Sequence, residues 1–150
     1  MTTVEILQVI REPLWLLQCE TPVPAGTPSL ADGSPISKID LNNLLVPHPD
    51  STYLARVQGT SMDGAPSHIP TGAMMAVDCS LTPESGDIVV AAVDGEFTVK
   101  RLIQRPDGYW LVPDNPNHSP TDTSLLGDRF QVWGVVTYVI NKMQRGRLRK

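Results

Sequence analysis

The stretch between residues 87 and 102 constrains the fold more than any other part of the sequence. Asp94-Gly95 separates two runs rich in strand-forming residues, 87–93 and 96–102. A type I′ turn needs positive φ at both central residues, which Gly adopts freely and Asp tolerates. The pattern therefore predicts a tight β-hairpin, with its two strands antiparallel.

Further short runs of strand-forming residues lie on both sides of this hairpin. They are bounded by Gly, Pro or Asp and cover residues 53–57, 73–77, 109–112 and 130–140. In the last run, Gly134 predicts a bulge or a close approach of another backbone. Several short strands at close spacing are typical of a compact, mostly antiparallel β domain. We therefore expect a mainly β fold over residues 39–143.

Proline sets the N-terminal part of the chain apart. Seven of the fourteen prolines lie between residues 13 and 49. Proline fixes φ and removes a backbone donor, so this stretch cannot form a long helix or an interior strand. We expect residues 1–38 to form an extended arm without a core of its own, in which residues 4–17 add a short helix or an edge strand. A second short helix is predicted at residues 40–45, with Asp40 as its N-cap.

Charge is distributed unevenly along the chain. The net charge is −4, yet five of the twelve positive charges lie in the last nine residues, so residues 1–141 carry seven positive against sixteen negative charges. An acidic body repels a phosphate backbone, and direct sequence-specific DNA binding is not expected. The basic tail, residues 144–150, is interpreted as a solvated terminus, with contact to nucleic acid or an acidic partner as the alternatives.

Several classes of protein are disfavoured by what the sequence lacks. The longest clean apolar run, residues 88–93, has six members, which is too short for a transmembrane helix. The N-terminus lacks the basic start and apolar segment of a signal peptide, so we expect a cytoplasmic protein. Cys19 and Cys79 have no metal-ligand spacing and are expected to be reduced thiols, without a metal or other cofactor. The histidines lie in predicted loops without an acidic residue or second histidine at ligand spacing, which predicts surface residues: His48, His68 and His118.

Ser61 is the first candidate for chemistry. It lies in the segment Gly59-Thr60-Ser61-Met62, directly after a predicted strand. A serine in this position is exposed beside a flexible glycine, where backbone N–H groups can point at a developing oxyanion. The alternative is an ordinary loop serine, because most Gly-x-Ser stretches have no catalytic role.

Lys100 is the second candidate. Strand alternation places it on the same face as Thr98 in the second hairpin strand. If that face is buried, the ammonium loses hydration and its pKa falls from about 10.4 toward neutrality. A neutral amine can take the proton of a serine hydroxyl, while Thr98 holds the amine by a hydrogen bond. The alternative is a solvated surface lysine.

Together these segments resemble a known family. Residues 59–62 and 86–100 resemble the LexA/UmuD self-cleaving serine peptidases of the bacterial SOS response. Residues 39–45, followed by His48-Pro49, and residues 130–136 are similar to the UmuD branch. The resemblance covers about residues 20–143. Residues 63–72 depart from the pattern, because they form a longer and more proline-rich segment that we expect to reshape the rim of the cleft.

The resemblance implies a catalytic role for four residues. Ser61 would be the nucleophile and Lys100 the general base, with Thr98 positioning the lysine. The backbone N–H groups of Thr60 and Ser61 would form the oxyanion hole. The implied fold is the compact LexA/UmuD-type peptidase domain.

The implied substrate is the chain's own arm. The family cuts an Ala-Gly or Cys-Gly bond upstream of the serine, and Ala25-Gly26 is the matching bond in this sequence. Only twenty-five residues precede this bond, too few for the DNA-binding domain of a LexA-type repressor. Signal peptidases share the Ser–Lys pair, but they need a membrane anchor that we do not expect in this chain.

The resemblance also implies partners. A UmuD-like protein forms a homodimer, cleaves itself when a RecA–single-stranded DNA filament shifts the population toward the cleavage-competent arrangement, and then serves a UmuC-like Y-family polymerase in error-prone translesion synthesis. Two alternatives stay open. One is a non-catalytic accessory module for the polymerase or RecA, and the other is a regulator of SOS genes that reads DNA through residues 145–150.

Overall fold

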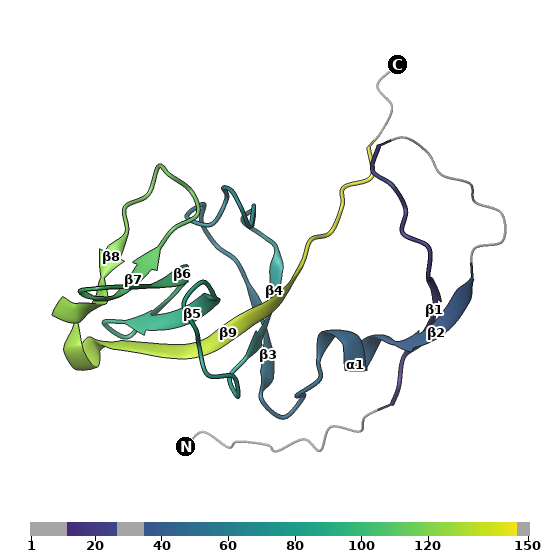
Figure 1. Ribbon diagram of the computed structural model, residues 1–150, viewed down its shortest axis with the longest axis horizontal. Helices are drawn as coiled ribbons and strands as arrows, with labels where there is room; N and C mark the ends of the chain where they lie inside the picture. The colour runs from purple at the N-terminus through teal and green to yellow at the C-terminus, as the bar shows by residue number, and fades with distance from the viewer. Residues whose placement is uncertain (1–11, 27–34, 147–150) are drawn as a thin grey trace, which may run out of the picture. The chain divides into compact units, whose positions relative to one another are not determined.

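The computed structural model describes residues 12–26 and 35–146, and the chain forms two compact units, Met1–Pro47 and His48–Lys150 (Figure 1). The predictions for residues 4–11 and for the end of the basic tail lie outside the described residues. Cys19 and Cys79 are free thiols, as expected.

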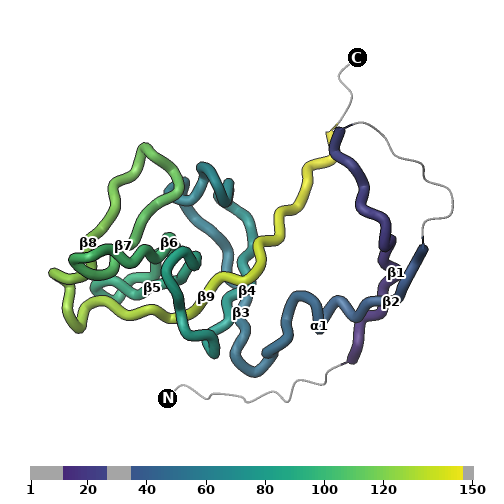
Figure 2. The backbone as a smooth tube through the Cα atoms, viewed as in Figure 1, coloured from purple at the N-terminus to yellow at the C-terminus, as the bar shows by residue number. Residues whose placement is uncertain are grey.

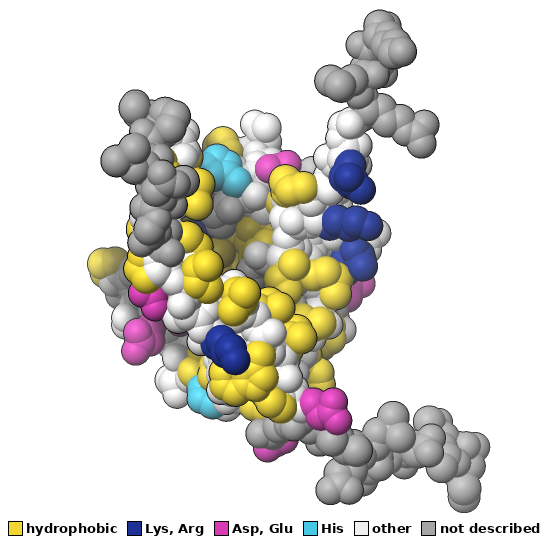
Figure 3. Space-filling view, turned by 90° about the vertical axis from the view of Figure 1, so that its right-hand side faces the viewer, with side chains coloured by type: hydrophobic (Ala, Val, Ile, Leu, Met, Phe, Trp, Pro, Cys, Tyr) yellow, Lys and Arg dark blue, Asp and Glu magenta, His cyan; other side chains and the backbone are white. Residues whose placement is uncertain are grey.

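The first unit is built on a two-stranded antiparallel hairpin. Its strands are β1 (Trp15–Cys19) and β2 (Ile36–Asp40). The proline-rich stretch lies between them in the sequence. The helix α1 (Leu41–Leu45) follows at once, and the Asp40 carboxylate accepts from the N–H groups of Asn42 and Leu14. The predicted helix and its N-cap are therefore confirmed. None of the described residues of this unit is buried. Its exposed hydrophobic side chains include Trp15, Leu17 and Val23, and such side chains are drawn in yellow in the space-filling view (Figure 3).

The second unit contains a seven-stranded sheet. All of its strand pairs are antiparallel, in the order β3-β4-β9-β5-β6-β7-β8. The strands are β3 (Thr52–Arg56), β4 (Met74–Asp78), β5 (Ile88–Val93), β6 (Glu96–Arg105), β7 (Gly108–Val112), β8 (Thr121–Asp122) and β9 (Phe130–Ile140). Two 3-10 turns, Thr123–Leu125 and Gly127–Arg129, precede β9. The prediction of a mainly β, mostly antiparallel fold is confirmed.

The predicted hairpin is the pair β5–β6. Its turn residues Asp94 and Gly95 have φ of 52° and 80°, the positive values that the Asp-Gly signal demands. Strand β9 passes along both β4 and β5, with Val135 opposite Asp78 on one and Val89 on the other (Figure 2). One strand therefore joins the two halves of the sheet.

Gly134 shows both features that the sequence predicts. The register of β9 against β5 slips by one residue next to it, which is a bulge. A Cβ at this position would lie 3.3 Å from the backbone carbonyl oxygen of Asp78 and 2.7 Å from Cγ1 of Val77. Only glycine therefore lets β9 pair with β4 at this position without displacing Val77 and Asp78.

The core has two parts, one on each face of β5. Val90 packs in one cluster and Val89 and Ala91 in the other, so successive residues of this strand are buried on opposite sides. This explains its continuous apolar sequence. Met62 and Ile69, both 1% exposed, come from the loop between β3 and β4 and enter the first cluster. The loop that carries Ser61 is therefore anchored in the core.

The described part of the chain contains no helix long and apolar enough to cross a membrane. Within residues 12–26 and 35–146, no group of three or more His, Cys, Asp or Glu side chains is arranged to hold a metal ion.

Candidate active site

Ser61 directly precedes Met62, whose buried side chain anchors this part of the loop in the core. Its loop folds back on itself, since the N–H of Ile69 donates to the carbonyl of Met62 over 2.8 Å and the N–H of Asp63 donates to Thr60 over 3.0 Å. Burying Met62 turns the preceding side chain outward, so that Ser61 is half-buried and faces β6.

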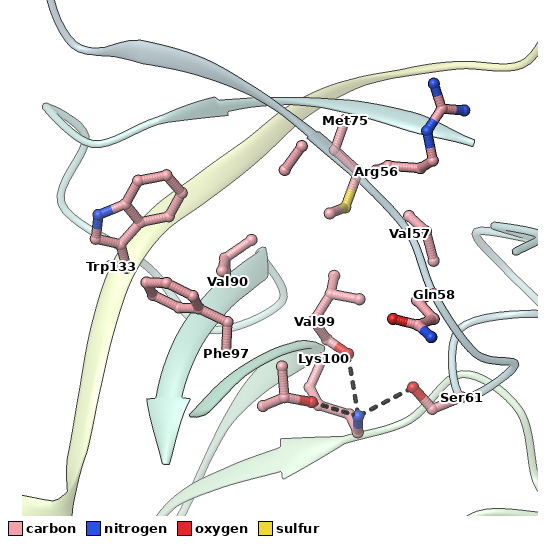
Figure 4. A pocket seen from close by; sticks show the side chains of 12 residues that line it. Arg56, Val57, Gln58, Ser61, Met75, Val90, Phe97, Val99, Lys100 and Trp133 are labelled. Atoms are coloured by element: carbon pink, nitrogen blue, oxygen red, sulfur yellow. Dashed lines mark hydrogen bonds between the residues drawn. The ribbon is translucent and has the colours of Figure 1, made fainter. Parts of the chain in front are cut away.

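Lys100 reaches Ser61 from strand β6. Its Nζ lies 2.9 Å from Oγ of Ser61, 2.8 Å from Oγ1 of Thr98 and 3.2 Å from the carbonyl oxygen of Val99 (Figure 4). Three acceptors thus match the three hydrogens of an ammonium group. Burial lowers the pKa of Lys100, because the charged form loses hydration. The structure therefore brings together three side chains that the sequence selected: Ser61, Thr98 and Lys100.

The three side chains lie at one end of a pocket of about 470 Å³. Figure 4 shows Phe97 and Trp133 at the other end, away from Ser61. Their ring centroids lie 5.3 Å apart, and the ring centroid of Tyr53 lies 5.2 Å from that of Trp133. The pocket is lined by Ala55, Arg56, Val57, Gln58, Ser61, Met75, Val90, Phe97, Thr98, Val99, Lys100 and Trp133. A pocket with aromatic side chains at one end and Ser61 and Lys100 at the other suits an extended peptide, with the reacting bond at the Ser61 end.

A second loop, which contains Asn115 and His118, holds the backbone beside Ser61 and was not predicted from the sequence. The backbone N–H of Asn115 donates to the carbonyl of Ser61 over 3.0 Å, and its side-chain amide donates to the carbonyl of Thr60 over 2.9 Å. Nε2 of His118 lies 3.0 Å from Oγ1 of Thr60. His118 is exposed, as predicted, but it borders the site instead of lying apart from it. No local pattern could show these contacts, since more than fifty residues separate the partners.

The sequence of residues 18–137 matches the family described as Peptidase S24-like. The chain belongs to this family. It is 37% identical to Protein ImpA of Salmonella typhimurium over 135 residues, which are 90% of this chain and 87% of that protein. It is 41% identical to Protein SamA of Salmonella typhimurium over 130 residues, 87% of this chain and 85% of that protein. It is also 41% identical to the LexA repressor of Acidithiobacillus ferrooxidans over 116 residues, 76% of this chain and 55% of that protein.

These relatives confirm the resemblance to the LexA/UmuD peptidases and to their UmuD-like branch. The match begins at residue 18, so it includes Ala25 and Gly26 as well as the pocket. Ala25 and Gly26 are exposed and form a bend, and a Cβ added at Gly26 would meet no atom within 4 Å. The bond that the family resemblance selects is therefore accessible.

The three histidines of this S24-like chain are exposed, as predicted, but His48 has an acidic partner that the sequence did not show. Nδ1 of His48 lies 2.6 Å from Oδ2 of Asp78, a carboxylate only 2% exposed. Pairing of β3 with β4 brings the two together, because it places Thr52 opposite Asp78. Burial raises the pKa of Asp78, but hydrogen bonds from Ser80, His48 and Ser51 outweigh it and hold that pKa well below its usual range. The cluster lies outside the pocket and stabilises the start of β3.

The proline-rich segment also differs from its prediction. None of residues 63–72 lies among the described residues that line the pocket, so the segment does not form its rim. It packs on the second loop instead. A Cβ at Gly64 would lie 2.6 Å from the carbonyl oxygen of Asp114 and 2.8 Å from Cα of Asn115. The two loops therefore touch backbone to backbone.

Proposed function

We propose that this chain is a self-cleaving serine peptidase of bacterial SOS mutagenesis, with Ser61 as nucleophile and Lys100 as general base. The observation that carries the proposal is the 2.9 Å separation of Oγ and Nζ at the end of a peptide-sized pocket. Membership of the S24-like family supports it independently.

The reaction begins with proton transfer. The neutral amine of Lys100 takes the proton of the Ser61 hydroxyl, and Oγ attacks the carbonyl carbon of Ala25. The protonated lysine then gives its proton to the nitrogen of Gly26 as the C–N bond breaks, which leaves Ala25 esterified to Ser61. Water, deprotonated by the same amine, hydrolyses the ester and restores the serine. The lowered pKa of Lys100 raises the fraction of neutral base, and Thr98 keeps the amine aligned.

The negative charge on the carbonyl oxygen needs donors during attack. The backbone N–H groups of Thr60 and Ser61 are the proposed oxyanion hole. Within residues 12–26 and 35–146 neither N–H has a protein acceptor, which supports this role because both are left to bind a substrate oxygen.

The proposed substrate is the bond between Ala25 and Gly26 in the arm. Pro22 and Pro24 disfavour a helix before it, so the segment can enter the groove in an extended form. Small side chains on both sides of the bond let it approach Ser61 closely. The exposed positions of Ala25 and Gly26 are compatible with this approach.

The proposed biological role follows the UmuD-like branch of the family. The chain acts in the cytoplasm as a homodimer, and a RecA–single-stranded DNA filament shifts it toward the arrangement in which the arm is cut. Loss of residues 1–25 then exposes a surface that binds a UmuC-like Y-family polymerase. The acidic charge of residues 1–141 supports action through protein partners in place of direct contact with DNA.

Intact mass over time tests the catalytic proposal. The wild type, Ser61→Ala and Lys100→Ala are incubated at pH ~7 and ~10, because deprotonation of lysine favours the base at the higher pH. We expect the wild type to lose residues 1–25, faster at the higher pH, while both variants stay intact. Lys142→Ala removes a lysine outside the pocket and should be cut like the wild type.

The fragment masses also locate the cut. Cleavage that needs Ser61 and Lys100 but falls at another bond would replace Ala25-Gly26 as the site and leave the catalytic pair in place. If the wild type stays intact even with RecA, nucleotide and single-stranded DNA, the peptidase proposal fails, and the chain acts as a non-catalytic accessory module.

A further inference from the structure

Asn115 contacts the nucleophile's backbone on both sides. Its side-chain amide donates to the carbonyl of Thr60 over 2.9 Å, and its backbone N–H donates to the carbonyl of Ser61 over 3.0 Å. One residue thus holds the peptide unit before the serine and the peptide unit after it.

The first of these bonds has a geometric consequence. A trans peptide is planar, with its C=O and N–H pointing in opposite directions. Fixing the carbonyl of Thr60 therefore fixes the direction of the N–H of Ser61. An oxyanion donor works only when it lies about 2.7–3.1 Å from the place where the oxyanion forms, so its direction matters for the rate.

The amide of Asn115 is itself held in one orientation. Its Oδ1 accepts from the N–H of Asn117 over 3.0 Å, which turns Nδ2 toward the carbonyl of Thr60. The neighbouring residue fixes the loop, because the Asp114 carboxylate accepts from Nε and from a terminal guanidinium nitrogen of Arg101 over 2.9 and 2.8 Å. Arg101 follows Lys100 on β6, so the loop is tied to the strand that carries the base.

We propose that Asn115 is a positioning residue that aims the N–H of Ser61 at the developing oxyanion. The inference rests on the proposed function of Ser61 and Lys100. It assigns a role in the reaction to a residue that touches neither the substrate nor the base.

The substitution Asn115→Asp tests this role. It keeps the side-chain size, the backbone N–H and an oxygen that can accept from Asn117. It removes the side-chain donor to the carbonyl of Thr60, which then accepts only from the N–H of Asp63 among the described residues. The matched control is Asn117→Asp, since it makes the same change of charge two residues along the same loop, on a side chain that is exposed. Asn115→Ala removes the donor without adding charge. Asn115→Gln restores an amide donor.

We expect Asn115→Asp and Asn115→Ala to cleave themselves about 10- to 100-fold more slowly than Asn117→Asp at every pH. Removing an oxyanion donor lowers a rate by about 100- to 1,000-fold, and changing the direction of a donor lowers it less. The pH at half-maximal rate should match the control, because the hydrogen-bond partners of Lys100 are unchanged. Asn115→Gln should recover most of the rate. Intact mass measures the rates, and thermal unfolding measures the fold.

Three outcomes would overturn the inference. The first is cleavage of either donor-less variant at the rate of the control. The second is a changed half-maximal pH together with a normal plateau, which would assign the effect to the base. The third is failure of both variants to fold, which would make Asn115 a structural residue. If the wild type itself is not cut, the proposed function fails and this inference falls with it.

Discussion

The two units of this chain differ in what holds them together. In Met1–Pro47 no described residue is buried, and Trp15 and Leu17 are 61% and 71% exposed. In His48–Lys150 two clusters of buried side chains pack on opposite faces of one sheet. A two-stranded hairpin without a core is only marginally stable in water. A sheet of three or more strands with packed apolar side chains can be stable by itself. The unit with a packed core carries the proposed catalytic side chains, and the unit without buried residues carries the proposed cleavage bond.

The largest expected effect is on the free energy of unfolding, when a leucine is replaced by alanine in each of the two units. Leu111→Ala removes a side chain 2% exposed and should lower the free energy of unfolding by about 2–5 kcal/mol. Leu17→Ala in the arm should change it by less than about 0.5 kcal/mol. Leu125→Ala is the matched control, because it makes the same substitution in the second unit at a position that is 80% exposed. Urea unfolding measures all three, and a large loss in Leu17→Ala would show that the arm has a core after all.

The next effect concerns the ion pair that supports the second loop. Asp114→Asn should cost about 1.5–3 kcal/mol near neutral pH, because hydrogen bonds between charged groups are among the stronger ones. Burial raises the pKa of Asp114, but hydrogen bonds from Arg101 and Ser67 lower it more, so its folded pKa lies below its unfolded value. The stabilisation is therefore present above about pH 4 and is lost as pH falls through the folded pKa.

Unfolding by urea at a series of pH values between neutral and acid tests this sign. The difference between wild type and Asp114→Asn should shrink as the pH falls. Asp63→Asn, at an exposed position of the neighbouring loop, should match the wild type throughout. A difference that stays constant with pH would exclude a role for the charge of Asp114.

The third effect is on rate. Because burial lowers the pKa of Lys100, the neutral base becomes dominant at a pH below the ordinary lysine value of about 10.4. Self-cleavage should rise about tenfold per pH unit below that pKa and then become level. Intact mass at closely spaced pH values measures the profile. A rise that continues beyond the ordinary lysine value would show that the folded unit does not lower this pKa.

The smallest effect is confined to the arm. The Asp40 carboxylate accepts from the N–H of Asn42, as the N-cap of α1, and from the N–H of Leu14, which directly precedes β1. Asp40→Ala should cost about 0.5–2 kcal/mol of local stability. Hydrogen exchange should accelerate at the N–H groups of Leu14 and Asn42 and remain unchanged in the strands of the second unit. Acceleration in β5 would show that the two units unfold together.

Local chemistry made part of this structure predictable. The Asp94-Gly95 turn, the Asp40 cap and the bounds of the last strand, Phe130–Ile140, depend on neighbouring residues and agree with the structure. The meeting of Thr98 and Lys100 follows from strand alternation, because two residues make one repeat. Their meeting with Ser61 was expected from a family resemblance and not from spacing.

The contacts that were missed join residues far apart in the chain. His48 meets Asp78 only after β3 and β4 pair, and Asn115 meets Thr60 only after the sheet has brought their two loops together. Neither partner carries a local signal, since a histidine or an asparagine in a loop has many uses. The support of the site therefore becomes visible only in the folded unit.

The hairpin of the arm has one further consequence. Strand β1 ends at Cys19 and β2 begins at Ile36, so the bond between Ala25 and Gly26 lies in the connection between two paired strands. While the chain is whole, the connection keeps the strands at a high effective concentration, and pairing costs only the closure of a short loop. A cut there would turn an internal pairing into an association between separate molecules, which dilution alone can dissociate. Release of the peptide would then need no further catalyst, and rejoining would become improbable as soon as it has diffused away.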